Sequence, residues 1–327
     1  MKIGVLGAGY LGKIHINCLK QIPEYELVGF HDKDYATSVE VAEQHSIRAY
    51  DDMDELIEDA EVVDIVTPTS THFECLKRVL SKKKHVFIEK PVVATKEEAK
   101  KLREMAKDCV TKIQVGHIER FNPAYKSVED MISSPIFIDM YRLSPYKNRG
   151  TDVPVTLDMM IHDIDILLHI VKSRISHISA CGMPIVSQTP DMTSARLEFE
   201  NGVMANLTAS RLATSTVRKC RIFQKNAYMI IDFNKQLSEV IKIVDTPDYS
   251  NPFALISNNI EGYSYPRQLV FEKPPIVQTN AIKEELKSLY DSIMHDTTPI
   301  VSLEDGIEAL EVALKIDELA ANTIISK

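Results

Sequence analysis

The chain has 327 residues, enough for two domains that each bury a core of their own. No apolar run is long enough to span a bilayer, and the net charge of -9 argues against a general nucleic-acid binder. Five scattered cysteines without a C-x-x-C pair argue against a disulfide framework or a zinc site and indicate reduced thiols. We therefore expect a cytoplasmic protein, and the charge and the short apolar runs predict no nucleic-acid or membrane partner.

The first 120 residues alternate short apolar runs with helical patterns. Runs such as KIGVLG, EVVDIVTP and KHVFIEKP are continuously apolar, which is typical of parallel strands that are covered on both faces. Right-handed crossovers between such strands produce a doubly wound sheet. Residues 1–120 are therefore predicted to form a nucleotide-binding α/β domain.

The pattern changes after residue 120. Between about residues 136 and 245, runs such as IFIDMYRL and GVMANLTAS indicate antiparallel strands, and Asn201-Gly202 is a hairpin signal. Helices are predicted near residues 156–171, 280–295 and 304–321. Residues 121–327 are thus predicted to form an α+β domain with an open, mainly antiparallel sheet. Because the open face needs a cover, we expect a homodimer or homotetramer formed through it.

A glycine-rich turn follows the first predicted strand and opens a helix. Gly7, Gly9 and Gly12 fit G-x-G-x-x-G, where the glycines permit a tight turn, close approach of a pyrophosphate, and helix–strand packing. The helix N-terminus adds unpaired N–H groups that favour a phosphate. We expect Tyr10 and Leu11, within this turn, to contact the cofactor as well. A glycine turn without a ligand is the alternative.

Asp32 ends the next predicted strand, 20 residues after Gly12. A carboxylate at this position accepts hydrogen bonds from both ribose hydroxyls and repels a 2′-phosphate, which favours NAD over NADP. A surface aspartate in a turn is the alternative. Thr67 and Pro68 follow another predicted strand, at the edge where open α/β sheets bind ligands, and His72 begins the next helix. We assign all three to the cofactor, although His72 is equally well read as a helix residue without a chemical role.

The run KHVFIEKP ends in Glu89-Lys90-Pro91, at the same predicted rim as the glycine turn. A lysine there can contact the cofactor and donate a hydrogen bond to a substrate oxygen, stabilising the alkoxide that precedes hydride loss. Glu89 can orient Lys90 or contact the cofactor ribose. The alternative is a solvated lysine at a strand end.

The helix predicted over residues 156–171 is apolar except for one polar stripe. At about 100° per residue, Asp158, His162, Asp165 and His169 fall within an arc of roughly 60°, and Asp163 points elsewhere. Asp158 and His162 are i,i+4 neighbours, and a carboxylate that bonds an imidazole raises its basicity and suits it to proton transfer with a hydroxyl. A metal site and a satisfied core network are the alternatives, and we predict no metal.

These motifs, in this order, resemble the glucose-fructose oxidoreductase / inositol dehydrogenase / MocA family over essentially the whole chain. The resemblance implies a Rossmann domain joined to an open-sheet α/β domain. It also implies a catalytic trio in which His162 moves the hydroxyl proton, Lys90 polarises the oxygen and Asp158 completes the set. The family usually carries a glycine two residues after this aspartate. Met160 stands there in this chain, a departure expected to narrow the pocket.

Two stretches, VGHIERFNPAY and DVPVTLDMMIHDID, are similar to the branch of the family that oxidises the 3-hydroxyl of UDP-N-acetylglucosamine. Arg120 lies in the first stretch, and Tyr146, Lys147 and Arg149 lie just before the second. We predict that these four residues bind the substrate, the basic loop through an anionic group such as a diphosphate. A solvated basic loop is the alternative.

The resemblance thus predicts an NAD-dependent dehydrogenase that oxidises a hydroxyl of a sugar or nucleotide-sugar, with the substrate between the two domains. Two alternatives remain open. One is an NAD-using glycosidase of the same fold, which oxidises and re-reduces the sugar transiently. The other is a non-catalytic dinucleotide-binding regulator.

Overall fold

The computed structural model describes residues 1–107, 109–146, 153–245, 250, 254–257 and 267–323. Their contacts divide the chain into two compact units. The first unit comprises Met1–Phe121 and Thr279–Glu311, and the second comprises Asn122–Gln278 and Val312–Lys327. Among the described residues, no helix combines the length and the apolar character that crossing a membrane requires.

The first unit is built on a parallel sheet whose order is β2-β1-β3-β4-β5. Every neighbouring pair in it is parallel, and its central strands are buried on both faces, as the continuous apolar runs predict. The predicted doubly wound sheet is confirmed. Its strands are β1 (Lys2–Leu6), β2 (Glu26–His31), β3 (Val62–Ile65), β4 (His85–Glu89) and β5 (Ile113–Gly116).

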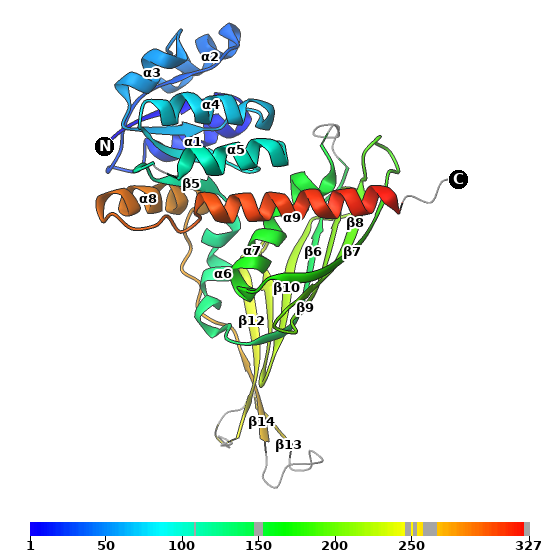
Figure 1. The fold of residues 1–327 in the computed structure, drawn as a ribbon. Coiled ribbons are helices and arrows are strands. Elements are labelled where there is room, and N and C mark those ends of the chain that lie inside the picture. The colour runs from blue at the N-terminus through cyan, green and yellow to red at the C-terminus, as the bar shows by residue number, and fades with distance from the viewer. Residues whose placement is uncertain (108, 147–152, 246–249, 251–253, 258–266, 324–327) are drawn as a thin grey trace. The chain divides into compact units, whose positions relative to one another are not determined.

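Helices flank this sheet, coloured blue to cyan in Figure 1 for the N-terminal part of the chain. Thr95 and Glu98 form a capping box that fixes the start of the fifth helix. The helices of the unit are α1 (Tyr10–Leu19), α2 (Tyr35–His45), α3 (Met53–Asp59), α4 (Thr69–Ser81), α5 (Lys96–Ala106), the 3₁₀ turn η1 (Ile118–Phe121), α8 (Ala281–Met294) and the first part of α9 (Leu303–Asn322).

The position of α8 corrects the predicted domain division, which placed every residue after 120 in the second domain. Leu286 and Leu289 of α8 are fully buried in the core that contains Ile16 and Leu19 of α1, and the Tyr25 hydroxyl donates to the Leu286 carbonyl at 3.0 Å. Residues 279–311 therefore belong to the first unit. An amphipathic pattern predicts a helix and its buried face but not which sheet that face covers.

The second unit contains a sheet with the order β13-β14-β12-β11-β10-β6-β9-β8-β7 in the described residues. Neighbours are antiparallel except β6 and β9, so the predicted open, mainly antiparallel sheet is confirmed. The strands are β6 (Pro135–Leu143), β7 (Ile175–Met183), β8 (Met192–Phe199), β9 (Met204–Ser210), β10 (Val217–Gln224), β11 (Ala227–Asp232), β12 (Leu237–Val244), β13 (Ala254–Ser257) and β14 (Arg267–Glu272).

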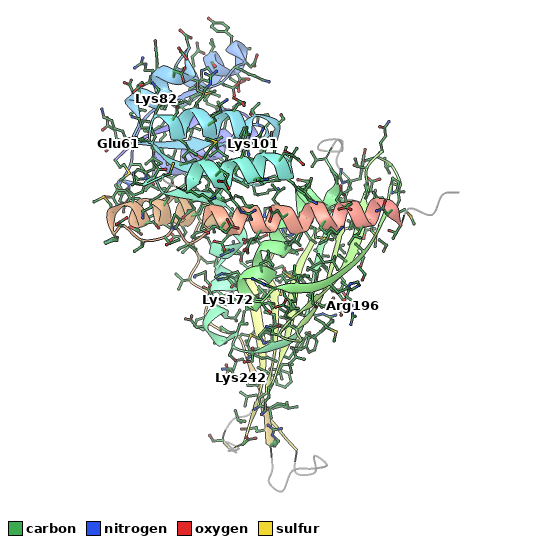
Figure 2. All side chains as sticks on the ribbon, viewed as in Figure 1. Glu61, Lys82, Lys101, Lys172, Arg196 and Lys242 are labelled. Carbon is green, nitrogen blue, oxygen red and sulfur yellow. The ribbon has the colours of Figure 1, made fainter. Side chains whose placement is uncertain are left out.

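One face of this sheet is covered by helices. The elements on it are α6 (Pro123–Lys126), the 3₁₀ turn η2 (Glu129–Met131), the π-helical turn η3 (Thr156–Met160) and α7 (Ile161–Val171) (Figure 1). Along β8 the residues alternate: Leu197 and Phe199 are buried, whereas Arg196 points outward (Figure 2). The predicted hairpin at Asn201-Gly202 joins β8 and β9, with Gly202 at φ 86.

Candidate active site

The glycine turn joins β1 to α1, where the pattern predicts it. Gly7 has φ 95, and a Cβ there would lie 2.8 Å from the Val66 carbonyl oxygen. A Cβ on Gly12 would clash with the Gly7 carbonyl oxygen. A Cβ on Gly9, by contrast, would meet no atom within 4 Å among the described residues. The turn thus needs glycine for its own geometry at two positions and is open at the third, which suits a bulky anion at the start of α1.

Asp32 follows β2 and is held against this turn. Its Oδ2 accepts from the Ala8 N–H at 2.7 Å and its Oδ1 from the Asp34 N–H at 2.9 Å. Each carboxylate oxygen has a second lone pair, so both can still accept a ribose hydroxyl. A hollow of about 360 Å³ adjoins Asp32 and is lined in part by Tyr35, Val39 and Tyr50. This arrangement is compatible with the predicted ribose contact.

Four strand ends form a row along one edge of the first sheet. The order β2-β1-β3-β4 sets the residues after these strands side by side, as Asp32, Gly7, Thr67 and Lys90. Adjacent strands lie about 4.8 Å apart, so the row spans about 14 Å. The structure therefore brings these four predicted cofactor residues together on one rim, at the carboxyl ends of the strands, where such sheets bind ligands.

His72, on α4, lies beneath this rim and is 1% exposed. Its Nδ1 is 2.9 Å from the Pro91 carbonyl oxygen and its Nε2 is 2.8 Å from the Thr67 carbonyl oxygen. Burial lowers the pKa of His72, although both carbonyls work in the opposite direction. The ring joins the end of β3 to the segment after Lys90, and its predicted contact with the cofactor stays a prediction. Pro68 is the residue that precedes α4.

Lys90 directly follows β4 and is partly buried. The Glu89 carboxylate turns back toward the protein interior: its Oε2 accepts from the Lys90 backbone N–H at 3.2 Å, and its Oε1 is 3.4 Å from Nε2 of His15. This geometry is compatible with the predicted orientation of Lys90, and both predicted roles of Glu89 stay predictions. The Lys90–Pro91 peptide bond is cis.

The sequence interpretation missed a buried polar group beside Glu89. His15, Asp64 and Glu285 are each 0% exposed, and His15 Nδ1 is 2.9 Å from Asp64 Oδ2. Within the described residues, His15, Glu89 and Glu285 are also the set whose donor atoms converge closely enough to hold a metal ion. A charge inside the apolar run EVVDIV and a histidine three residues after Gly12 were the available signals.

The second unit carries the other predicted catalytic residues, and their helix differs from the prediction. Its first turn, Thr156–Met160, is π-helical, and α7 begins only at Ile161. The N–H groups of Leu157 and Asp158 both meet the Pro154 carbonyl oxygen at 3.1 Å. The wider turn contains an extra residue, which allows both Met160 and Ile161 to be fully buried. Sequence periodicity does not distinguish such a turn from an α-helix.

The predicted polar stripe does not share one environment. Asp158 is exposed, His162 is partly buried and Asp165 is 1% exposed. His169, farther along, places Nε2 at 3.0 Å from Glu129 Oε1. The structure therefore leaves Asp158 and His162 as the accessible end of the stripe, where their predicted roles remain predictions.

Asp163 points elsewhere, as predicted: its Oδ1 pairs with Arg142 of β6 at 2.7 Å, with both side chains 3% exposed.

The structure describes two of the four predicted substrate-binding residues, Arg120 and Tyr146. Arg120 is 4% exposed in the first unit, where its guanidinium lies 3.3 Å from Asp305 Oδ1 and 3.4 Å from the Ile300 carbonyl oxygen. These contacts indicate a structural role, and contact with substrate stays a prediction. Tyr146 is 40% exposed. Lys147 and Arg149 lie outside the described residues.

Known proteins show the same organisation. Residues 1–117 match the Gfo/Idh/MocA oxidoreductase family with its NAD-binding Rossmann fold, and residues 137–229 match the Gfo/Idh/MocA C-terminal domain. A UDP-N-acetylglucosamine 3-dehydrogenase from Acidithiobacillus ferrooxidans is 35% identical over 71% of this chain and 74% of its own length.

Two further likenesses cover almost the whole chain. A solved structure of a UDP-N-acetylglucosamine 3-dehydrogenase from the same organism superimposes with a TM-score of 0.88 at 28% identity, covering 100% of this chain and 99% of its own. A myo-inositol 2-dehydrogenase from Thermotoga maritima is 25% identical over 95% of this chain and 93% of its own length. The predicted family is confirmed: the chain belongs to the Gfo/Idh/MocA family and is an NAD(P)-dependent dehydrogenase acting on CH–OH groups.

Proposed function

We propose that this dehydrogenase uses NAD to oxidise a hydroxyl of a sugar or nucleotide-sugar, namely the 3-hydroxyl of a UDP-N-acetylhexosamine. The observation that carries the proposal is the row of Asp32, Gly7, Thr67 and Lys90 along one rim, which sets a ribose acceptor and a cationic donor at its two ends. The substrate rests on the relative that is 35% identical and is named for this reaction.

The residues of the rim fit a dinucleotide. Gly9 would lie against the pyrophosphate, the N-terminus of α1 would face its charge, and Asp32 would accept from the adenosine ribose. Bound NAD supplies the acceptor for the hydride that leaves the sugar carbon. The negative charge of Asp32 disfavours a 2′-phosphate, which supports NAD over NADP.

Residues of the chain itself remove the hydroxyl proton and stabilise the hydroxyl oxygen. His162 removes the hydroxyl proton, and Asp158, four residues earlier, orients the imidazole and raises its basicity. The Lys90 ammonium donates to the hydroxyl oxygen and stabilises the alkoxide while the carbon loses hydride. In this reaction Lys90 and His162 act on the same hydroxyl.

The direct test is an assay of NADH formation with purified protein, NAD and a panel of sugars. UDP-N-acetylglucosamine should give NADH, whereas free N-acetylglucosamine and UDP-glucose should give much less. Cleavage of a glycosidic bond without net NADH would identify the transient-oxidation glycosidase instead. Cofactor binding with no turnover of any sugar would identify a regulator, and either result would overturn the proposal.

The catalytic assignment is tested by Lys90→Met, which keeps much of the side-chain length and removes the charge. Turnover should fall on the order of 10²–10³ when one preorganised donor is lost, while NAD affinity changes far less. His162→Ala should also cripple turnover, with partial recovery at high pH, where hydroxide replaces the base. Lys101→Met, on the exposed surface of α5 (Figure 2), is the matched control. Normal turnover of Lys90→Met would make Lys90 a solvated lysine.

We also propose that the chain forms a homodimer or homotetramer through the outer face of the second sheet. Phe223 stacks on Tyr228 with ring centroids 4.5 Å apart and meets Phe137 at 5.8 Å, and a hollow of about 420 Å³ adjoins Tyr228. Phe223 is 37% exposed, so this aromatic group remains partly open to a second copy. Light scattering should give at least twice the chain mass, and Phe223→Lys should lower it. A monomeric native protein would contradict the proposal.

A further inference from the structure

Four titratable side chains from four different elements meet in the interior of the first unit. His15 comes from α1, Asp64 from β3, Glu89 from β4 and Glu285 from α8. Three of them are 0% exposed and Glu89 is 9% exposed. Among the described residues, both carboxylate oxygens of Glu285 lack a hydrogen-bond partner, and one of them lies within 4.8 Å of the donor atoms of His15 and Glu89.

The charges of this group do not balance if every carboxyl is ionised. One imidazolium can offset one carboxylate, which would leave two uncompensated negative charges in a buried place. Burial disfavours a charge on His15, but Asp64 and Glu89 outweigh it and raise the pKa of His15 well above its ordinary value. Burial, and then the charge of Glu89, raises the pKa of Glu285 well above its ordinary value. With His15 as imidazolium and Glu285 as a neutral acid, one net negative charge remains instead of two, and burial raises the pKa of Asp64 as well.

The Glu89 carboxylate sits in a narrow slot. On one side its Oε1 faces His15 Nε2 at 3.4 Å. Gly116 of β5 also lines the slot, because a Cβ there would lie only 2.8 Å from that same Oε1. Its second oxygen accepts from the Lys90 N–H at 3.2 Å. The carboxylate that occupies this slot is therefore also the one that contacts the backbone of Lys90.

We propose that His15 and Glu285 are positioning residues for Lys90, because they hold the Glu89 carboxylate in the orientation that anchors the Lys90 backbone. This inference rests on the catalytic role proposed above for Lys90. A proton on Glu285 lets that side chain stand beside Glu89 without repulsion, and Asp64 fixes the imidazole from its Nδ1 side at 2.9 Å. The proton on Glu285 thus helps to fix the Glu89 carboxylate, and through it the backbone of Lys90 on the rim.

Two variants disturb the slot in different ways. Glu285→Leu removes the acid and leaves Glu89 facing an apolar group, and Gly116→Ala presses a methyl group against Glu89 Oε1 without changing any charge. Each should lower kcat by ~10-fold or more through misplacement of Lys90, with NAD affinity nearly unchanged. The double variant should be less than additively worse because both changes act on one carboxylate.

Glu285→Gln is the conservative variant, because it keeps the shape of a neutral acid and cannot carry a charge. It should restore most of the turnover that Glu285→Leu loses. Glu284→Gln makes the same chemical change one residue away, on the exposed side of α8, and is the matched control. If Glu285→Gln loses as much turnover as Glu285→Leu, the acid must be ionised and the inference is wrong.

Three further results separate this inference from its rivals. About one tightly held divalent ion per native chain, absent from Glu285→Gln, would make the group a metal site and overturn the positioning role. Full turnover of Gly116→Ala would overturn it even if Glu285→Leu fails to fold. If Lys90→Met is inactive while both slot variants retain full turnover, the proposed function stands and this inference alone fails.

Discussion

Asp191 gives a prediction whose size follows from the structure. It lies in the turn between β7 and β8 and is 0% exposed. Its Oδ2 accepts three backbone N–H bonds, from Ile185 at 2.8 Å, Val186 at 2.7 Å and Ser187 at 2.9 Å. The neighbouring Pro190 carbonyl accepts from the N–H of Val155, just before the π-helical turn that carries Asp158. The carboxylate therefore holds a loop that contacts the start of the helical segment proposed to be catalytic.

Burial opposes ionisation of Asp191, but the hydrogen bonds from Ser187, Val186 and Ile185 outweigh it and lower its pKa from 3.8 to about 2. At about 1.36 kcal/mol per pH unit, ionisation of Asp191 stabilises the fold by ~2.5 kcal/mol at neutral pH. Because the folded pKa is the lower one, this contribution is fully present above pH ~4 and is lost as the pH falls toward 2. Near pH 3 roughly half of it should remain.

Asp191→Asn keeps the shape of the side chain and removes the charge. Denaturant unfolding should show a loss of ~2.5 kcal/mol at pH 7, and the gap to the native protein should narrow between pH 5 and pH 3. Asp130→Asn, at an exposed position of the same unit, should change little at either pH. A variant as stable as the native protein at pH 7, or a gap independent of pH, would refute the reasoning.

Three further outcomes are expected. Asp32→Ala should weaken NAD binding by ~10-fold and relax the exclusion of NADP, because a ribose acceptor and a repulsive charge both disappear; native protein that binds NADP more tightly in titration would contradict this. Arg142→Met should lower the free energy of unfolding by ~3–5 kcal/mol, because it leaves Asp163 as an uncompensated buried charge; replacing Asp163 with Asn in the same chain should recover part of the loss in denaturant unfolding. Chelation should leave turnover unchanged and elemental analysis should find no stoichiometric metal, whereas loss of activity with EDTA would support the metal alternative.

Local sequence signals were enough for the scaffold of the first unit. Continuously apolar runs predicted a parallel sheet because such strands are buried on both faces. Gly7 and Gly12 marked the turn through their spacing; a side chain at Gly12 would meet the backbone of Gly7 within the turn, whereas one at Gly7 would meet the backbone of Val66 at the end of β3. The hairpin at Asn201-Gly202 was likewise predictable from a local signal.

Long-range packing explains most of what the sequence did not reveal. The apolar face of α8 gave no indication that it covers a sheet built some 200 residues earlier in the chain. The π-helical turn before α7 ends at two consecutive buried residues, Met160 and Ile161, and the periodicity of 3.6 residues averages over such a local insertion. An ideal helix predicts one polar stripe, whereas Asp158, His162 and Asp165 differ in exposure in the structure.

The buried group in the first unit shows why a sequence can reveal a candidate catalytic residue but not the residues that position it. Lys90 stands out because it ends an apolar strand, but its backbone is held by Glu89, which is held in turn by His15. Asp64 inside an apolar run is a strong sign that a partner exists, since an isolated buried carboxylate is disfavoured by several kcal/mol. Only the fold identifies that partner as His15 and adds Glu285 from a distant helix. Positioning residues such as His15 and Glu285 belong to no sequence motif, because their role depends on which helices and strands pack together in the fold.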